Sequence, residues 1–184
     1  MDGEHSEKKI VERARSGDQE AFGQLYQQYY QPIYRYVFYR VNHQQDAEDL
    51  TEKIFLKAWE RLPGYRGDAS FKSWVYRIAH TIVIDHYRTR KRPLPLNEAS
   101  SLADGRPDFE TTLMAQEKIE RLKAIMSRLS PLDQQVLTLR FINGLSTGET
   151  AQILGRTIGS VRVLQHRALK AAHTLWAAQE ITNE

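Results

Sequence analysis

The spacing of apolar residues constrains the fold of this chain more than any other feature. Along most of the 184 residues, apolar side chains recur every three or four positions, and the strict alternation typical of strands is absent. One such series contains Phe22, Leu25, Tyr26, Tyr29, Ile33, Tyr36, Val37 and Val41. This period predicts an all-α protein built from consecutive amphipathic helices.

Residues that favour helix ends divide the first half of the chain into four helices. A short helix is expected over residues 7–15, and Asp18 and Asp46 are expected to cap the next two. Pro63 and the glycine after it end the third helix, because proline and glycine interrupt the helical pattern. A fourth helix starts at Ser70 and continues into a run of basic residues.

A segment of different composition separates two helical domains. Residues 93–112 contain three prolines and many small polar residues, which is the composition of a flexible linker. We therefore expect one domain over residues 1–92 and another over residues 113–184. Charge follows the same division: residues 93–116 have a net charge of −3, and the segments on either side each have +3.

Composition excludes several classes of protein. The chain has no cysteine, which excludes disulfide scaffolds, thiol nucleophiles and cysteine-ligated metal sites. Apolar runs stay well below the roughly 18 residues of a membrane-spanning helix, and the first residues lack the apolar core of a secretory signal. We therefore expect a cytoplasmic protein.

The second half has the pattern of a helix-turn-helix. A helix is expected over residues 109–129, and Ser130 is expected to cap another over residues 132–143. Ser146 and Glu149 then form a capping box that opens a short helix. That helix ends at Gly155, and a longer basic helix follows over residues 158–178. Its outer and flanking residues are Arg162, Val163, Gln165, His166, Arg167 and Lys170.

Such a helix is suited to the major groove of DNA. Arginine can pair with guanine, glutamine with adenine, and further cations hold phosphates. Residues 156–170 carry four basic side chains and no acidic one, which favours DNA binding. The alternative is a solvated charged face on an ordinary helical hairpin.

Rings and cations alternate at the end of the first half. They are Tyr65, Arg66, Phe71, Lys72, Trp74, Tyr76, Arg77, Tyr87 and Arg88. This mixture suits single-stranded nucleic acid, because unstacked bases lie on aromatic faces while phosphates meet lysine and arginine. The alternative is that Phe71 and Trp74 belong to the core.

Catalytic and metal-binding patterns are weak. None of the six histidines is four residues from another, as a helical metal site requires. His80, Asp85 and His86 are close in sequence, but their spacing directs them to different helix faces. We expect no enzyme activity, no metal and no cofactor, and an enzyme using these three residues remains the least favoured alternative.

Two ordered groups of motifs resemble the extracytoplasmic-function (ECF) group of the bacterial sigma-70 family of RNA polymerase sigma factors. The first group contains DAEDL at 46–50, FLKAW at 55–59 and YRGDASFKSWVYRIA at 65–79. The second contains LSP at 129–131, AQILG at 151–155, GSVR at 159–162 and HRA at 166–168. The resemblance covers nearly the whole chain and implies sigma region 2 and sigma region 4 joined by a linker.

The resemblance implies three sets of functional residues. The helix over residues 46–62 would dock on the β′ clamp helices of RNA polymerase core, and its expected contacts are Asp46, Asp49, Glu52, Lys53, Leu56 and Trp59. The minus-ten element would be melted and captured by Tyr65, Arg66, Asp68, Phe71, Lys72, Trp74, Tyr76, Arg77, Asp85 and Arg88. The minus-thirty-five element would be read by Arg156, Ser160, Arg162, Val163, His166, Arg167 and Lys170.

The same resemblance implies further partners and a conformational change. In the family, region 4 meets the β flap, the acidic linker threads toward the active-site and RNA-exit channels, and an anti-sigma factor commonly holds the protein inactive. Closure of the two domains on each other buries DNA-binding surfaces in the family, and this linker is long enough to allow it.

Three residues depart from the family pattern. Glu52 and Lys53 stand where the family usually has glutamine and glutamate, which alters the charge of the expected docking surface, and Gly148 stands where an acidic residue is common. A two-domain DNA-binding regulator that does not engage polymerase is therefore the alternative function.

Overall fold

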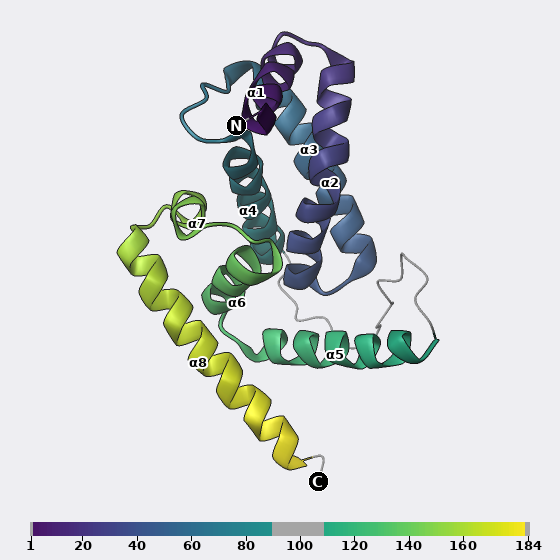
Figure 1. Ribbon diagram of the computed structural model, residues 1–184, viewed down its shortest axis with the longest axis vertical. Coiled ribbons are helices and arrows are strands. Elements are labelled where there is room, and N and C mark those ends of the chain that lie inside the picture. Colours follow the sequence, from purple (N-terminus) through teal and green to yellow (C-terminus); the bar gives the residue numbers. More distant parts are fainter. Residues whose placement is uncertain (1, 90–108, 183–184) are drawn as a thin grey trace.

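The computed structural model describes residues 2–89 and 109–182, and within these ranges every regular element is helical (Figure 1). The first half contains α1 (Asp2–Arg15), α2 (Gln19–Val41), α3 (Gln44–Arg61), the short η1 (Leu62–Gly64) and α4 (Phe71–Thr89). The second half contains α5 (Phe109–Arg128), α6 (Pro131–Leu137), η2 (Thr138–Ile142), α7 (Thr147–Leu154) and α8 (Ile158–Thr182). The expected all-α class is confirmed, and most of the expected linker lies outside the described residues.

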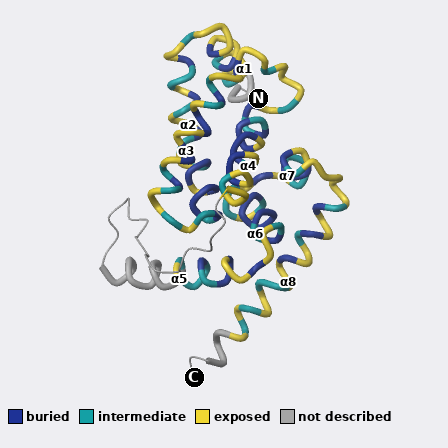
Figure 2. The backbone as a smooth tube through the Cα atoms, turned by 180° about the vertical axis from the view of Figure 1, so that it is seen from behind, coloured by how far each residue is buried: buried dark blue, intermediate teal, exposed yellow. Residues whose placement is uncertain are grey.

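Helices α1 to α4 form a bundle around an aromatic core. Figure 2 shows the buried faces of α2, α3 and α4 turned toward one another. The largest fully buried side chains include Tyr36 of α2 and Tyr76 of α4, whose rings meet edge to face with centroids 5.6 Å apart. Burying rings of this size supplies much of the hydrophobic stabilisation of a small bundle.

The helix starts of the first half agree with the sequence at one cap and differ at another. Asp18 caps α2 as predicted, since its Oδ1 accepts a hydrogen bond from the Ala21 N–H at 3.0 Å. The prediction that Asp46 caps the next helix was wrong: the cap of α3 is His43, whose Nδ1 accepts from the Asp46 N–H at 3.3 Å. Asp46 therefore lies in the first turn, where its negative charge interacts favourably with the positive end of the helix dipole.

The second half follows its predicted caps but not its predicted helix lengths. Ser130 caps α6, Ser146 and Glu149 form the capping box of α7, and Gly155 ends α7 in the left-handed region with φ of 61°. The predicted helix over residues 132–143 is not uniform, because the α-helix ends at Leu137 and continues as one π-helical turn, η2. Helix α8 continues beyond the predicted end at residue 178 to Thr182.

The two halves pack directly against each other. Leu139, Leu145 and Ile153 of the second half belong to the same buried cluster as the core of α1 to α4. A second, smaller cluster of Met126, Leu129, Leu137 and Ala168 joins α5, α6 and α8. In Figure 1, α6 and α7 lie beside α4, while α8 extends away from the bundle. The described chain is thus in a closed arrangement.

Candidate nucleic-acid interface

The helix-turn-helix is formed by α7, a tight turn and α8. The side chain of Ser146 accepts from the Glu149 N–H at 3.1 Å, and the Glu149 carboxylate accepts from the Ser146 N–H at 2.6 Å. Burial alone would raise the pKa of Glu149, but these bonds and the nearby Lys72 outweigh it and hold that pKa below its ordinary value. A charged N-terminal turn therefore fixes the start of α7.

The buried face of α8 fixes the orientation of the helix and leaves its opposite face in solvent. Val161, Leu164 and Ala168 are buried, as the helical spacing requires. Of the seven residues predicted to read the minus-thirty-five element, all but the half-buried Ser160 are exposed: Arg156, Arg162, Val163, His166, Arg167 and Lys170. Val163 has the highest exposed fraction of the large exposed apolar residues, at 69%. Arg156 lies in the turn before α8, and the other six residues lie on the side of α8 opposite its buried residues.

Three contacts of the recognition helix were missed by sequence reasoning. The Thr157 hydroxyl accepts a hydrogen bond from the Ser160 N–H at 3.2 Å. A threonine just before the expected start of the helix was the signal that could have predicted this bond. Arg140 Nε donates to Gln165 at 2.9 Å, and the Asp133 carboxylate accepts two hydrogen bonds from Arg167. These last two pairs join residues 25 and 34 positions apart, so local spacing does not reveal them.

The residues predicted to contact the minus-ten element fall into groups with different exposure. Arg66 and Asp68 are exposed in the loop before α4, and Asp85 and Arg88 are exposed near its end, with 3.6 Å between Asp85 Oδ1 and Arg88 Nη1. Tyr65 is half-buried, and its hydroxyl donates to the Ala69 carbonyl at 2.5 Å. These residues are available to a ligand at both ends of α4.

Two members of the same set lie inside the bundle. Phe71 is 2% exposed and Tyr76 is fully buried. Phe71 contacts the rings of Tyr29 and Tyr65, with centroids 5.4 and 6.3 Å away, and also packs beside the half-buried Trp74. In this arrangement Phe71 is a core residue, which was the alternative interpretation of the sequence. A direct contact of Phe71 or Tyr76 with DNA stays a prediction.

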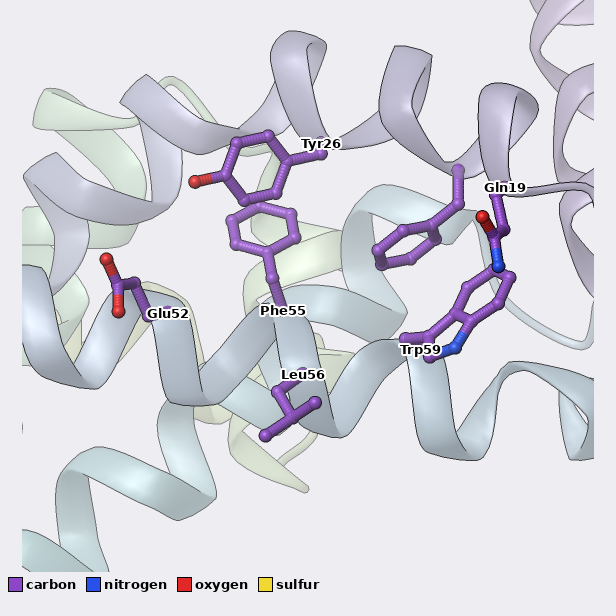
Figure 3. Close-up of a pocket in the computed structure, with 7 residues that line it drawn as sticks. Gln19, Tyr26, Glu52, Phe55, Leu56 and Trp59 are labelled. Carbon is purple, nitrogen blue, oxygen red and sulfur yellow. The ribbon is translucent and has the colours of Figure 1, made fainter.

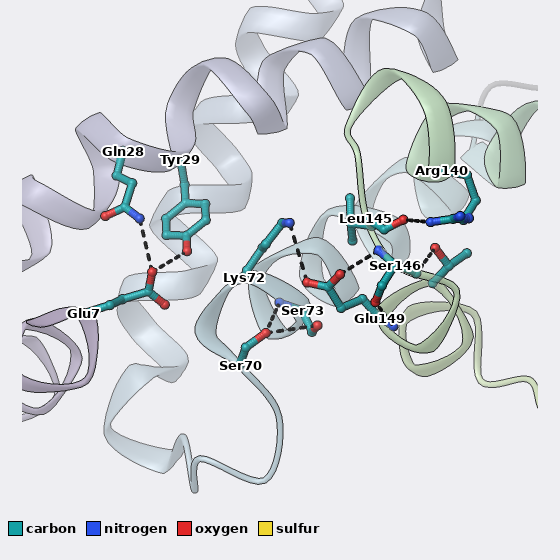
Figure 4. Close-up of polar contacts among 11 residues, drawn as sticks. Glu7, Gln28, Tyr29, Ser70, Lys72, Ser73, Arg140, Leu145, Ser146 and Glu149 are labelled. Carbon is teal, nitrogen blue, oxygen red and sulfur yellow. Dashed lines mark hydrogen bonds and ion pairs between the residues drawn. The ribbon is translucent and has the colours of Figure 1, made fainter. Parts of the chain in front are cut away.

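Two cations of the set contact the helix-turn-helix. The Lys72 ammonium lies 3.5 Å from the Glu149 carboxylate (Figure 4). Arg77 Nη2 donates to the Gln152 carbonyl at 3.1 Å. Both cations come from α4, and both partners come from α7. In the closed arrangement, α7 therefore occupies the face of α4 on which these cations would meet phosphates.

A second group of polar contacts joins α2 and α4 to α6 and η2. Arg40 Nη1 donates to the Pro131 carbonyl at 2.7 Å, and the Asn143 amide donates to the Pro32 carbonyl at 2.7 Å. The Gln135 amide donates to the Tyr36 hydroxyl at 3.2 Å and also contacts the ring of His80. Buried polar groups that find such partners stabilise a specific packing of the two halves.

The histidine-based enzyme alternative receives no support from this geometry. His80 is at the contact with α6, and burial and the charge of Arg40 lower its pKa below the ordinary value of 6.5. Asp85, by contrast, is exposed and lies beside Arg88. Among the residues that the structure describes, no three metal-ligating side chains come together.

Three of the six residues expected to dock on polymerase line an open groove between α2 and α3. The groove has a volume of about 430 Å³ and is lined by Gln19, Phe22, Tyr26, Glu52, Phe55, Leu56 and Trp59 (Figure 3). Leu56 is 60% exposed, and the Trp59 ring packs on Phe22 with centroids 4.8 Å apart. The groove thus offers apolar surface beside a carboxylate.

The remaining docking residues lie elsewhere on α3. Asp49 and Lys53 are exposed, while Asp46 is half-buried beside His43. Burial and the Glu52 carboxylate raise the pKa of Tyr26. The altered pair, Glu52 and Lys53, is exposed, and only Glu52 lines the groove.

Comparisons with known proteins agree with this architecture. Sigma-70 region 2 matches residues 25–93, and Sigma-70, region 4 matches residues 119–171. The ECF RNA polymerase sigma factor BldN of Streptomyces coelicolor is 37% identical over 88% of this chain and 62% of BldN. This chain therefore spans less than two thirds of that relative. The RNA polymerase sigma factor YlaC of Bacillus subtilis is 36% identical over 78% of this chain and 85% of YlaC.

Solved structures show the same fold. CnrH in complex with the cytosolic domain of CnrY has a TM-score of 0.75 and 24% identity, and the match covers 94% of this chain and 97% of that chain. The sigma factor RpoE in complex with the anti-sigma factor NepR, from Bartonella quintana, has a TM-score of 0.70 and 20% identity over 85% of this chain and 96% of that chain.

None of the described helices has the length and apolar character needed to span a membrane. Members of the matching family regulate transcription and are not enzymes. The two region matches, the order of their motifs and the identity to YlaC over most of its length together show that this chain belongs to the ECF group of the sigma-70 family of RNA polymerase sigma factors.

Proposed function

We propose that the protein binds RNA polymerase core and directs promoter-specific transcription initiation. In this proposal, α8 reads the minus-thirty-five element as duplex, and α4 with its preceding loop captures the melted minus-ten element. The observation that carries it is the exposed basic face of α8, which stays in solvent although η2 and α7 are packed against the bundle. The protein contributes binding energy and catalyses no reaction.

Duplex reading is supported by the residue types on this face. Arg162 and Arg167 have the donor geometry that pairs with guanine in the major groove, and Val163 is placed to contact a thymine methyl group. Arg156 and Lys170 add positive charge toward the two ends of the face, where the phosphate backbone would pass.

Strand capture is supported by rings and cations around the start of α4. The Tyr65 and Trp74 rings have centroids 5.2 Å apart and are both half-buried, so each keeps part of its surface in solvent. Exposed Arg66 is nearby in sequence and would meet phosphates. Binding of an unstacked base on such a surface offsets the few kcal/mol that unstacking costs.

Docking on polymerase core is supported by the groove between α2 and α3. Leu56 is a large aliphatic side chain with most of its surface in solvent, which is typical of a partner-binding site. The β′ clamp helices are the proposed occupant of the groove, and the β flap is the proposed partner of region 4. These interactions would occur in the cytoplasm.

The closed arrangement implies that the two halves must separate before promoter opening. Lys72 and Arg77 cannot hold α7 and promoter phosphates at the same time. We propose that polymerase core favours the separated form and that an anti-sigma factor opposes it. The RpoE complex with NepR supports the existence of such a partner for this fold.

The function is tested by reconstitution with sigma-free RNA polymerase core and a library of randomised promoter DNA. The proposal predicts a stable complex with core and transcripts from templates that share two spaced motifs. A protein that binds duplex DNA but neither binds core nor supports transcripts would establish the alternative, a two-domain DNA-binding regulator.

A further inference from the structure

Arg167 differs from the other cations of the recognition helix because an acidic residue holds it. Its Nε and Nη2 atoms donate to the same carboxylate oxygen, Asp133 Oδ1, at 3.1 and 2.7 Å. Neither Arg162 nor Lys170 has an ion pair to a described residue. Arg167 is thus the one cation of the α8 face whose orientation is set from another helix, within the described part of the chain.

The carboxylate that holds Arg167 is itself held. Asp133 is in the first turn of α6, its side chain is 9% exposed, and its second oxygen accepts from the Ser130 hydroxyl at 2.6 Å. Its backbone N–H donates to the same hydroxyl at 3.2 Å. Helix α6 lies beside α8 (Figure 1), so this cap of one helix directs a side chain of the other.

The pairing leaves part of the guanidinium available. The Arg167 side chain is 56% exposed, and both of its bonds to Asp133 use the Nε and Nη2 edge. The other edge, formed by Nη1 and the second hydrogen of Nη2, makes no hydrogen bond to the residues that the structure describes. Val163, one helical turn earlier, shares this face and is strongly exposed.

An arginine held in this way is suited to reading a base more than to neutralising a phosphate. Pairing with a carboxylate cancels most of the charge that would attract a phosphate, while it fixes the plane of a flexible side chain. A bidentate contact with guanine depends on that plane, and fixing it beforehand lowers the ordering cost of binding.

We propose that Asp133 is a positioning residue for promoter reading, which orients Arg167 toward a guanine of the minus-thirty-five element. This inference rests on the proposed function, because it assigns a task within the duplex-reading site. It distinguishes Arg167, a base reader whose orientation is set before binding, from Arg162 and Lys170, which no described carboxylate orients.

The test uses the full chain with RNA polymerase core and a library randomised in the minus-thirty-five element. In the wild type, one position should strongly favour guanine. Asp133→Asn keeps the side-chain size and an oxygen for Ser130, but it removes the charge that holds Arg167. We expect it to lower the guanine preference about tenfold, within the range set by one bidentate base contact, while affinity for nonspecific duplex stays equal or rises.

Two further variants distinguish positioning from a structural role. Arg167→Lys keeps the charge at an exposed position but not the planar fork, and it should lose the same preference. Asp133→Asn together with Arg167→Lys should lose no more than Arg167→Lys alone. Glu60→Gln removes the carboxylate of the surface Lys57–Glu60 pair in α3 and should leave the base preference unchanged.

Each result decides the inference. A parallel loss of specific and nonspecific affinity in Asp133→Asn would mean that Asp133 only supports the fold, and an undiminished guanine preference would mean that it does not position Arg167. Either result overturns the inference and leaves the proposed function intact. A wild type that binds core but enriches no minus-thirty-five sequence would overturn the proposed reading function and this inference together.

Discussion

His80 lies in α4 with its ring against Gln135 of α6, and the Tyr36 hydroxyl and the Arg40 guanidinium are the other polar groups at this contact. Its pKa is lowered below 6.5 in the closed arrangement, chiefly because burial disfavours the charged ring. A histidine in solvent takes up a proton as the pH falls through about 6.5, and the buried one resists. Closure is therefore fully favoured above this pH and weakens below it.

This pH dependence is measurable because the chain has no cysteine of its own. Dyes on Glu60→Cys and Thr174→Cys would report the distance between the halves, and energy transfer should fall between pH 7.5 and pH 5.5. In His80→Gln, which replaces the ring by a neutral polar side chain, the decrease should disappear. A wild type with constant energy transfer, or an equal decrease in His80→Gln, would contradict this account.

Local spacing predicts the burial of a residue well where it depends on that residue's own helix. It predicts contacts between two distant helices poorly. It gives the apolar series along α2, and the members Leu25, Ile33 and Val37 of that series are fully buried. It does not predict that Lys72 meets Glu149, because these residues are 77 positions apart and belong to different predicted domains. Pairings of this kind come from the packing of the whole chain.

At the scale of single elements, helix starts were predictable wherever the cap is a common one. The serine and aspartate caps of α2, α6 and α7 are as predicted, whereas His43 was missed because histidine is a rare N-cap. The π-helical turn η2 was missed as well, since its apolar spacing does not differ from that of an α-helix over five residues.

The capping box of α7 should account for part of the stability of the helix-turn-helix. Ser146→Ala removes the hydroxyl that accepts from the Glu149 N–H and should lower the free energy of unfolding by about 1 kcal/mol. Chemical denaturation of the full chain measures this change. Ser127→Ala, at an exposed serine in α5, should change it by less than about 0.5 kcal/mol. Equal effects of the two changes would refute a special role for the cap.

The groove on α3 should contribute to polymerase binding without contributing to folding. Leu56→Asp places a charge in the apolar groove and should weaken affinity for core at least about tenfold, or about 1.4 kcal/mol. Its thermal midpoint should stay near that of the wild type because Leu56 is mainly exposed. Ile84→Asp changes another exposed aliphatic residue, on α4, and is the matched control for binding to core in the absence of DNA.

At the scale of the whole molecule, closure and promoter opening compete for the same face of α4. Arg77→Cys combined with Gln152→Cys places two thiols where α4 and α7 touch, and a bismaleimide would then lock the closed form. The locked protein should form at least about tenfold less open complex than the same variant with singly alkylated cysteines. Because both samples lack Arg77, the comparison isolates the effect of the cross-link. Equal opening by both forms would show that the halves need not separate.

The division into two helical regions could be predicted from sequence because proline content, charge and helical period all change between them. The packing of those regions on each other could not. It depends on side chains such as Leu139, Leu145 and Ile153, which belong to the second predicted domain but join the core of the first. A single sequence contains no signal that shows whether an apolar side chain packs within its own domain or against the other one.

The most direct test of the account is permanganate footprinting of a promoter enriched from the random library, with the protein and RNA polymerase core together. Permanganate oxidises unpaired thymines, so it reports strand opening at the minus-ten element. The account predicts reactive thymines there only when both the protein and core are present, with duplex protection one promoter element upstream. Duplex protection by the protein without any core-dependent reactive thymine would contradict it.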